Sequence, residues 1–202
     1  MKYFVTAIDT DSGKTLVSAI LCEALKADYW KPVQAGLPRD SETVKKLITN
    51  KNSRIHPESY LLNTPASPHA AAKIDGISIN LSAFKTPETT NTLVIEGAGG
   101  CLVPLNDNDL IVDLIKIQQA ETVLVSDLYL GSINHTLLTI EALQRRAIPI
   151  KGIIFNGESN TESERIISLR SQLPCLLRIN KEAIINQNTV AKYAALLMKN
   201  WK

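Results

Sequence analysis

The feature that most constrains the fold is an alternation of short apolar runs with longer helical patterns. Apolar runs of strand length lie at 2–8, 29–33, 92–96, 122–126, 150–156 and 174–179. Most are apolar throughout, which is typical of parallel strands covered on both faces. Helical patterns lie between them, at 14–27, 41–49, 109–119, 132–146, 161–172 and 182–199. We therefore predict an α/β fold, with a mostly parallel sheet and helices on both of its faces.

Residues 50–91 fit this alternation poorly, because they contain four prolines and many polar residues. We expect loops and short helices there, at one edge of the sheet. The sequence has no internal repeat, low-complexity tract or linker. Residues 1–202 are therefore predicted to form a single domain, a length that one hydrophobic core can support.

Composition argues against several classes of partner. The net charge is only +2, without a basic stripe interleaved with aromatic residues, so no nucleic-acid partner is expected. No signal peptide is evident, and no apolar run approaches the roughly 20 residues of a membrane span, so no membrane association is expected. Cys22, Cys101 and Cys175 are odd in number and far apart, which indicates reduced thiols in the cytoplasm. We expect each of the three to be a small core residue.

Polar residues follow several strands where those strands end. They lie at 9–15, 31–36 and 96–100 and at Asn156. In an open parallel sheet, ligands bind beyond the carboxyl ends of the strands. One site is therefore predicted at this edge.

The first of these segments, "DTDSGKT", resembles a phosphate-binding loop. Such a turn directs backbone N–H groups and a helix N-terminus at phosphate oxygens. Lys14 would neutralise phosphate charge, Thr15 would offer its hydroxyl to Mg²⁺, and Thr10 and Asp11 would line the same cradle. The usual pattern has a glycine where Ile8 stands, so the loop is expected to follow a somewhat different path. The alternative is a plain strand–turn–helix with a chance "GKT".

The segment "YWKPVQAG" places Lys31 at the end of a hydrophobic run, just before a proline that stops strand pairing. The alternative interpretation is an ordinary surface lysine. A lysine flanked by Trp30 and Pro32 is harder to solvate than that, which favours a functional role. Its ammonium there would stabilise charge on a transferring phosphoryl group or on an attacking anion.

In "LVIEGAGG" an apolar strand ends on Glu96, followed by glycines that let the backbone approach a ligand closely. Mg²⁺ prefers a few hard oxygen ligands, so Thr15, Glu96 and one more carboxylate would suffice. Asp40 is the best third candidate from residue types, although it could equally be a helix N-cap. Asp127 also follows a strand and is assigned no role.

The segment "LGSINH" opens a helix at Gly131 and Ser132, whose free N–H groups would bind a carboxylate or belong to a simple N-cap. The three histidines lack metal-ligand spacing, and none has an evident partner for a catalytic triad.

Taken together, "TAIDTDSGKT", "WKPVQAG", "SPH", "EGAGG", "LGSINH" and "FN" occur in the order and rough spacing of one family. The sequence resembles the dethiobiotin synthetases, which use ATP to close a ureido ring on 7,8-diaminopelargonate with CO₂. The resemblance covers residues 2–157 well and the remaining C-terminal residues poorly. It implies a P-loop NTP hydrolase type of sheet, Mg²⁺ as cofactor, ATP as co-substrate, and a homodimer with active sites at the subunit interface.

The resemblance also implies residue roles. Catalytic roles are implied for Lys31, Lys14 and Thr10, and a Mg²⁺ site for Thr15, Asp40 and Glu96. Nucleotide binding is implied for Asp11, Ser12, Gly13, Lys14, Thr15, Leu16, Glu96, Gly99 and Asn156. Substrate binding is implied for Asp11, Lys31, Ala35, Ser67, Gly131, Ser132, Ile133 and Asn134.

Some of these roles are specific. Asp11 matches a position near the substrate amine that is usually Glu, and Ser67 matches a loop near the diamine. Residues 131–134 match a segment that one subunit lends to its partner's site, at the tail carboxylate of the substrate. Asn156 matches the position that reads the base. The chain departs from the family at Ala7, at Ala35 and in the tail, which lacks the proline-containing segment that covers the adenine.

Two rival classes share such a sheet. The first is a dimeric nucleotide switch of the partition-ATPase type, but that pattern has a lysine where Asp9 stands. Some of those switches bind membranes through a C-terminal amphipathic helix, and Val190, Ala194, Leu197 and Trp201 fall on one helical face. We expect that helix to dock on the sheet. The second class is a related P-loop amidoligase that acts on a larger acid. Such enzymes usually carry a glutaminase domain with a reactive cysteine, for which we expect no room in this chain.

Overall fold

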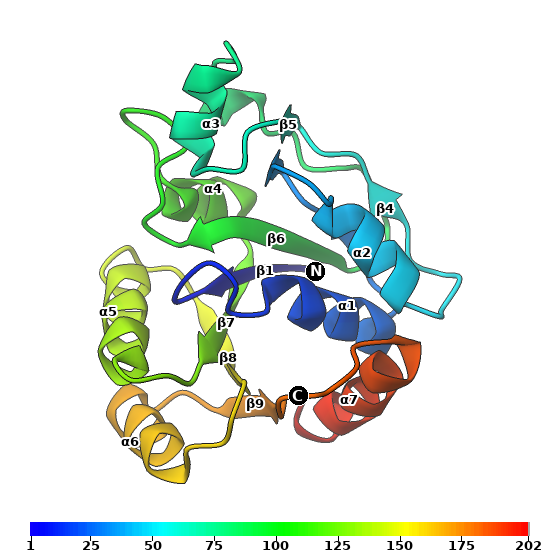
Figure 1. The fold of residues 1–202 in the computed structure, drawn as a ribbon, viewed down its shortest axis with the longest axis vertical. Helices are drawn as coiled ribbons and strands as arrows, with labels where there is room; N and C mark the ends of the chain where they lie inside the picture. Colours follow the sequence, from blue (N-terminus) through cyan, green and yellow to red (C-terminus); the bar gives the residue numbers. More distant parts are fainter. Residues whose placement is uncertain (202) are drawn as a thin grey trace.

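The computed structural model describes residues 1–201, which form a seven-stranded parallel sheet with helices on both faces (Figure 1). The strand order is β4-β2-β6-β1-β7-β8-β9. These strands are β1 (Lys2–Ala7), β2 (Asp28–Trp30), β4 (Ile55–His56), β6 (Leu93–Gly100), β7 (Glu121–Asp127), β8 (Ile150–Asn156) and β9 (Cys175–Arg178). The predicted fold is confirmed.

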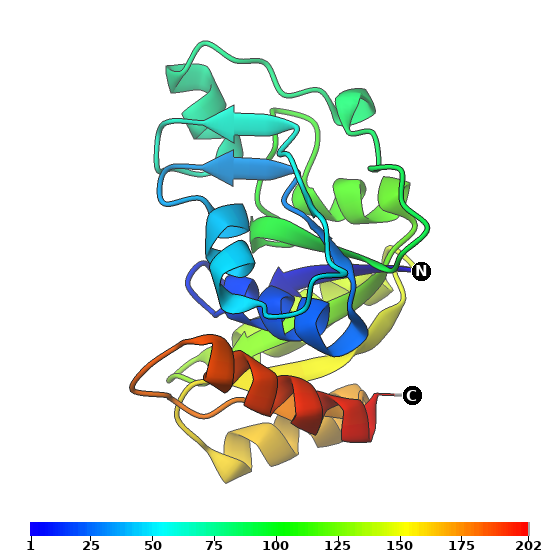
Figure 2. The ribbon, with the colours of Figure 1, turned by 90° about the vertical axis from the view of Figure 1, so that its right-hand side faces the viewer.

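The helices divide between the two faces of the sheet (Figures 1 and 2). One face carries α1 (Lys14–Leu25), α2 (Asp40–Leu47) and α7 (Gln187–Asn200). The other carries α4 (Ile111–Gln118), α5 (Ser132–Gln144) and α6 (Thr161–Ser171), and α3 (Pro68–Ile74) packs on two further short strands, β3 (Val33–Ala35) and β5 (Tyr60–Leu62). Because both faces are covered, alternate residues of β1 bury into opposite halves of the core: Tyr3 and Val5 contribute to one, and Phe4 to the other.

Residues 50–91 contain strand structure that the sequence analysis did not predict. Besides β4, the strand β5 (Tyr60–Leu62) pairs in parallel with β3 (Val33–Ala35) in a separate two-stranded sheet. The expected short helices are α3 and the 3₁₀ turn η1 (Leu81–Ala83). Strands of two or three residues give no detectable periodicity, so only their pairing partners reveal them.

The C-terminal helix begins at Gln187 rather than at residue 182, because the side chain of Asn186 caps it by accepting from Thr189 N. Val190, Tyr193, Ala194 and Leu197 are buried against α1 and the sheet. Trp201 packs edge-on against Tyr3, with ring centroids 5.0 Å apart. The expected docking is therefore confirmed. None of the helices in residues 1–201 combines the length and hydrophobicity of a transmembrane segment.

The expectation for the cysteines is partly wrong. Cys22 and Cys101 are buried, but Cys175 is exposed. It is the first residue of β9, which lies at an edge of the sheet, so one flank of this residue has no covering strand.

Candidate active site

The sheet register brings Lys31 and Glu96 together. Trp30 of β2 is the partner of Ile95 in β6, so the residues that follow them lie side by side at the carboxyl edge. The structure corrects one boundary here, because β6 continues beyond Glu96 to Gly100 instead of ending at the carboxylate. The glycines stay in the strand because Gly100 pairs with Ala7 of β1.

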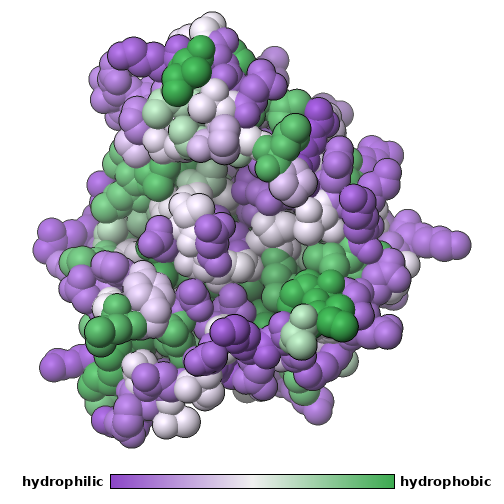
Figure 3. Space-filling model, in the orientation of Figure 1, coloured by the Kyte–Doolittle hydropathy of each residue, from purple (hydrophilic) through white to green (hydrophobic). Residues whose placement is uncertain are grey.

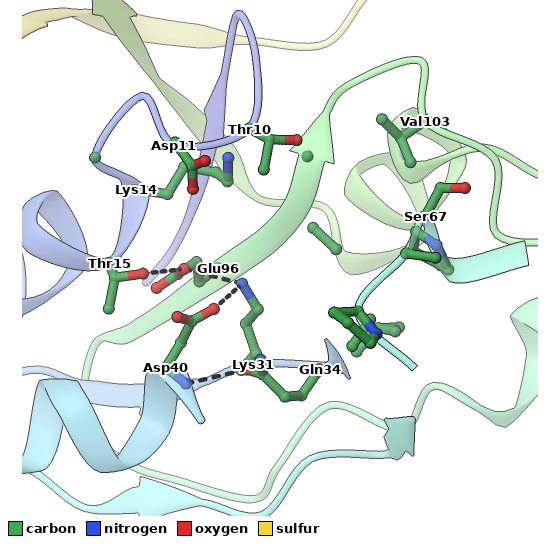
Figure 4. Close-up of a pocket in the computed structure, with 18 residues that line it drawn as sticks. Thr10, Asp11, Lys14, Thr15, Lys31, Gln34, Asp40, Ser67, Glu96 and Val103 are labelled. Atoms are coloured by element: carbon green, nitrogen blue, oxygen red, sulfur yellow. Dashed lines mark hydrogen bonds and ion pairs between the residues drawn. The ribbon is translucent and has the colours of Figure 1, made fainter. Parts of the chain in front are cut away.

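Lys31 is the centre of a buried cluster of charges (Figure 4). Its Nζ lies 2.7 Å from Asp40 Oδ2 and 2.9 Å from Glu96 Oε1, and it also donates to Gly97 O at 3.0 Å. Only 4% of Lys31 is exposed. Burial alone would lower its pKa, but the charges of Glu96 and Asp40 outweigh burial and raise the pKa. The ammonium therefore keeps its charge and points inward rather than into solvent.

Glu96 receives hydrogen bonds from three side chains. Thr15 Oγ1 and Lys31 Nζ donate to Oε1, each at 2.9 Å. Tyr29 OH donates to Oε2, also at 2.9 Å. Burial and the charge of Glu96 raise the pKa of the Tyr29 phenol well above its ordinary value, so the hydroxyl remains a donor.

The loop between β1 and α1 closes around the carbonyl of Asp9. Lys14 Nζ donates to this oxygen at 3.0 Å, and Ser12 Oγ donates to it at 3.1 Å. Gly13 has a φ of +95°, and a side chain there would collide with the Asn156 amide. Burial, together with the repulsion of Lys31, lowers the pKa of Lys14 to about 8. The phosphate-binding loop thus contains a lysine that loses its charge at a lower pH than an ordinary lysine does.

These groups share one cavity of about 590 Å³. The predicted site residues that line it are Thr10, Asp11, Gly13, Lys14, Thr15, Lys31, Ala35, Asp40, Ser67, Glu96 and Gly99. Figure 4 shows how they arrive from different elements: the loop after β1, the end of β2, the start of α2, β6 and the segment before α3. The predicted convergence is therefore confirmed for the polar segments that follow β1 and β2 and for the one in β6, whereas Asn156 at the end of β8 does not line the cavity.

Comparison with known proteins identifies the family. A family model described as an AAA domain matches residues 1–189. The ATP-dependent dethiobiotin synthetase BioD of Cytophaga hutchinsonii is 57% identical over 202 residues, which cover 99% of this chain and 98% of the relative. The proteins of the same name from Christiangramia forsetii and Agrobacterium fabrum are 51% and 44% identical, over 98% and 91% of this chain and 96% and 91% of their own. The chain belongs to the dethiobiotin synthetase family.

Solved structures show a similar fold at low identity. The septum site-determining protein MinD of Pyrococcus horikoshii, complexed with Mg-ADP, gives a TM-score of 0.58 at 15% identity and covers 98% of this chain and 90% of its own. A putative plasmid partition protein of Borrelia burgdorferi bound to AMPPNP gives 0.59 at 11% identity, covering 98% of this chain and 96% of its own. These proteins share the P-loop fold with the dethiobiotin synthetase family, but the close sequence relatives do not favour the nucleotide-switch alternative.

Some residues implied by the resemblance to dethiobiotin synthetases lie outside the cavity. Ser12 is buried with its hydroxyl turned to Asp9 O, and Leu16 packs against the core. Asn156 Nδ2 donates to Ser12 O at 2.9 Å, so this amide holds the loop. Residues 131–134 lie at the start of α5, where Gly131 is the N-cap residue. The Ser132 hydroxyl is buried without a hydrogen-bond partner among the described residues, so it does not cap the helix.

The structure also adds residues that the dethiobiotin synthetase resemblance did not supply. The N-cap alternative for Asp40 is wrong, because α2 begins at Asp40 and Arg39 precedes it. Instead, Asp40 N donates to Gln34 Oε1 at 3.0 Å, and Gln34 lines the cavity. The other lining residues not predicted are Val33, Pro65, Ala66, Pro68, Ala98 and Val103. They are apolar, and apolar residues beside a site carry no chemical signal in a sequence. Tyr29 and Gln34 both belong to "YWKPVQAG", but only the strand register reveals what they contact.

Proposed function

We propose that this protein is an ATP-dependent dethiobiotin synthetase, a ring-closing ligase that converts 7,8-diaminopelargonate and CO₂ to dethiobiotin. The observation that carries the proposal is the position of the Lys31 ammonium. It lies in the same cavity as Thr10, Lys14 and Thr15 of the phosphate-binding loop, and it is held there by Glu96 and Asp40.

The reaction needs no covalent enzyme intermediate. The 7-amino group takes up CO₂ and loses a proton, which gives a carbamate. A carbamate oxygen attacks the γ-phosphorus of ATP and ADP leaves, which gives a carbamic–phosphoric anhydride. The neighbouring amine then attacks the carbonyl carbon, the ring closes, and phosphate is expelled. The enzyme therefore has to bring an anion to a triphosphate, and positioned cations are the main requirement.

Lys14 and Lys31 are the cations that this chain supplies. We assign Lys14 to the nucleotide phosphates, because it belongs to the phosphate-binding loop. We assign Lys31 to the carbamate and the transferring phosphoryl group, with Thr10 beside them as a hydroxyl donor. A single preorganised donor of this kind is typically worth about 2.7–4 kcal/mol of transition-state stabilisation.

The oxygen atoms around Lys31 also fit Mg²⁺. Thr15 Oγ1, Glu96 Oε1 and Asp40 Oδ2 are hard donors, and the last two already hold a cation in the form of the Lys31 ammonium. We propose these three residues as the Mg²⁺ ligands. When bound, the ion neutralises charge on the phosphate oxygens.

The remaining wall of the cavity suits an aliphatic amino acid. Val33, Ala35, Ala98 and Val103 provide apolar surface for the pelargonate chain. We assign Asp11 and Ser67 to the amines, since a carboxylate attracts ammonium groups and a hydroxyl accepts from them. Gly99 has a φ of +67° and turns the backbone here; a side chain at this position would press against Val103.

We propose a homodimer in which the start of α5 completes the partner's site. Tyr129, Leu130, Ile133 and Leu138 are exposed in and before this helix, with Leu130 at 104%. Figure 3 shows hydrophobic residues gathered on the side of the molecule that carries α5 and α6. A dimer that covers them would place Gly131, Ser132, Ile133 and Asn134 at a second protomer's substrate, where the N-terminus of α5 attracts a carboxylate.

Two further assignments belong to the proposal. Asn156 adjoins the loop through Ser12, which supports a position near the nucleotide; we assign its carbonyl oxygen to the base. The three free cysteines suit a reducing compartment such as the cytoplasm.

The test is phosphate release from ATP in the presence of Mg²⁺ and bicarbonate, with and without 7,8-diaminopelargonate. We expect release to depend on the diamine and to match the dethiobiotin formed. Release that is independent of the diamine would contradict the ring-closing function. Sedimentation with lipid vesicles and nucleotide tests the switch alternative, for which the docked α7 gives no support; the protein is expected in the supernatant.

A further inference from the structure

Tyr29 contacts the candidate active site from the core side. It is the middle residue of β2, and its side chain is 0% exposed. Its hydroxyl donates to Glu96 Oε2 at 2.9 Å, and it has no other hydrogen-bond partner within residues 1–201. A buried tyrosine hydroxyl usually has a partner. Here that partner is one of the carboxylates proposed to hold the metal ion.

The two oxygens of Glu96 have different surroundings. Oε1 accepts from Thr15 and Lys31, both of which line the cavity. Oε2 accepts from Tyr29, which does not line the cavity. Because the terminal torsion of a glutamate is soft, a carboxylate without an anchor samples several orientations. The bond from Tyr29 restrains this torsion and keeps Oε1 directed at the cavity.

The tyrosine itself is well fixed. Tyr29 pairs with Val94 of β6, two residues before Glu96, so its side chain and that of Glu96 lie on the same face of the sheet. The ring belongs to the buried cluster that packs α1 against the sheet. Because close packing fixes the ring of Tyr29, its hydroxyl holds the Glu96 carboxylate in one orientation.

We propose that Tyr29 is a positioning residue, which orients the Glu96 carboxylate for a divalent cation and thereby sets the affinity of the site for that ion. The inference rests on the proposed Mg²⁺-dependent function. Loss of the hydrogen-bond partner of a metal-ligating side chain typically weakens metal binding about 10–100-fold. Because Tyr29 is outside the cavity, its hydroxyl should have no effect on nucleotide affinity in the absence of metal.

The experiment uses Tyr29→Phe, which keeps the ring and removes the hydroxyl. Mn²⁺ is the probe, and its binding to the full chain in the presence of ADP is followed by electron paramagnetic resonance. We expect the Kd for Mn²⁺ to rise about 10–100-fold. The affinity for ADP in EDTA, measured by calorimetry, should not change.

Tyr3→Phe is the matched control. Tyr3 is also buried, at 3% exposure, and its hydroxyl donates to Met1 Sδ at 2.8 Å, away from the cavity. This variant makes the same chemical change and should leave Mn²⁺ binding as it is. A general loss of stability would affect both variants, whereas a positioning role affects only Tyr29→Phe.

The outcomes separate this inference from the proposed function. If Glu96→Gln abolishes Mn²⁺ binding and Tyr29→Phe leaves it unchanged, Tyr29 is only a core residue and the proposed function stands. If the unsubstituted protein with ADP binds no Mn²⁺, the metal site itself is wrong, and the role of Tyr29 is overturned with it.

A second measurement covers the case in which Tyr29→Phe does not fold. The protein is labelled with 3-fluorotyrosine, and the resonance displaced by Glu96→Gln identifies Tyr29. Addition of Mg²⁺ with ADP should shift that resonance. A resonance that does not respond overturns the inference.

Discussion

Strand β2 has a buried carboxylate site at or beside each of its ends. At the carboxyl end, Lys31 pairs with Glu96 and Asp40 beside a cavity of about 590 Å³. At the amino end, Asp28 is 4% exposed and lies within 3.1 Å of His56 Nε2, beside a hollow of about 820 Å³. Burial, charge and a neighbouring hollow therefore do not distinguish the two ends, and the amino end has the larger hollow.

Hydrogen bonding does distinguish them. Four donors reach the two oxygens of Asp28: Arg54 N, Thr89 Oγ1, Asn91 Nδ2 and His56 Nε2, at 2.8–3.2 Å. Two carboxylate oxygens offer about four acceptor sites, so this group is saturated from within the protein. Its donors come from β4 and from the segments before β4 and β6, which indicates that it fixes one edge of the sheet.

The carboxyl end is incompletely saturated, because Glu96 accepts from three donors and, in the described part of the chain, the side chain of Asp40 accepts only from Lys31. Glu96 and Asp40 share one ammonium, and both line the cavity. A ligand phosphate or a metal ion can therefore compete for these groups. The comparison teaches that a buried charge marks a functional site when its partners can be exchanged with a ligand, and a structural site when they cannot.

The largest expected effect is a difference in turnover between substitutions at the two ends of β2. Lys31→Met removes the cation assigned to the attacking anion, and turnover should fall by about 10²–10³-fold or more. Diamine-dependent phosphate release is the measurement. Asp28→Asn is the control at the other end, and its turnover should remain close to that of the unsubstituted protein. An Asp28→Asn variant that folds but loses activity would remove the distinction.

The next effect concerns the metal ion. Glu96→Gln keeps the shape of the side chain and removes its charge, so the Mg²⁺ concentration for half-maximal activity should rise by at least about 10-fold, as expected for a damaged metal site. The free energy of unfolding in EDTA, obtained with urea, shows whether the fold survives. A variant that unfolds instead would make Glu96 a structural residue, like Asp28.

The third effect tests Lys14. Its pKa of about 8 means that the ammonium loses its proton as the pH rises through 8, whereas an ordinary lysine stays charged. ADP affinity in EDTA should therefore weaken by about 10-fold between pH 7 and pH 9. Lys14→Arg is the control, because a guanidinium remains charged throughout this range. Equal ADP affinity of the unsubstituted protein at pH 7 and pH 9 would contradict the lowered pKa of Lys14.

The sequence predicts the fold and most of the cavity for a definite reason. Apolar strands and polar strand ends are local patterns, and the parallel arrangement places those ends at one edge. These local patterns are enough to identify Lys14, Lys31 and Glu96, because none of the three requires the strand register. Asp40 needed the family resemblance, because a carboxylate at a helix start has an equally good local explanation.

The rest depends on contacts between segments distant in sequence. The bond from Tyr29 to Glu96 exists because β2 pairs with β6 in one particular register. The saturation of Asp28 depends on loops around Arg54 and Asn91 that have no periodic pattern. These features separate a structural carboxylate from a functional one, and a single sequence does not carry them.

The smallest expected effect is a change in the free energy of unfolding caused by a substitution at the amino end of β2. Burial would raise the pKa of Asp28, but its hydrogen bonds with Arg54 N, Thr89, His56 and Asn91 outweigh burial and lower it. A carboxylate with a lowered pKa stabilises the fold at neutral pH and loses this contribution as the pH falls through its folded-state pKa. Asp28→Asn should therefore lower the free energy of unfolding by about 1–3 kcal/mol at pH 7.

The same variant should lose less at pH 3, which is below the ordinary pKa of an aspartate, because the unfolded state then binds more protons than the folded state and the stability supplied by the carboxylate declines. Urea unfolding of both proteins at pH 7, 5, 4 and 3 measures the difference. A difference that stays constant over this range would mean that ionisation of Asp28 does not stabilise the fold, because Asn keeps the shape of the side chain and removes its charge. The cost would then come from the amide nitrogen, which cannot accept the hydrogen bonds that a carboxylate oxygen accepts, and the saturation of Asp28 would not depend on its charge.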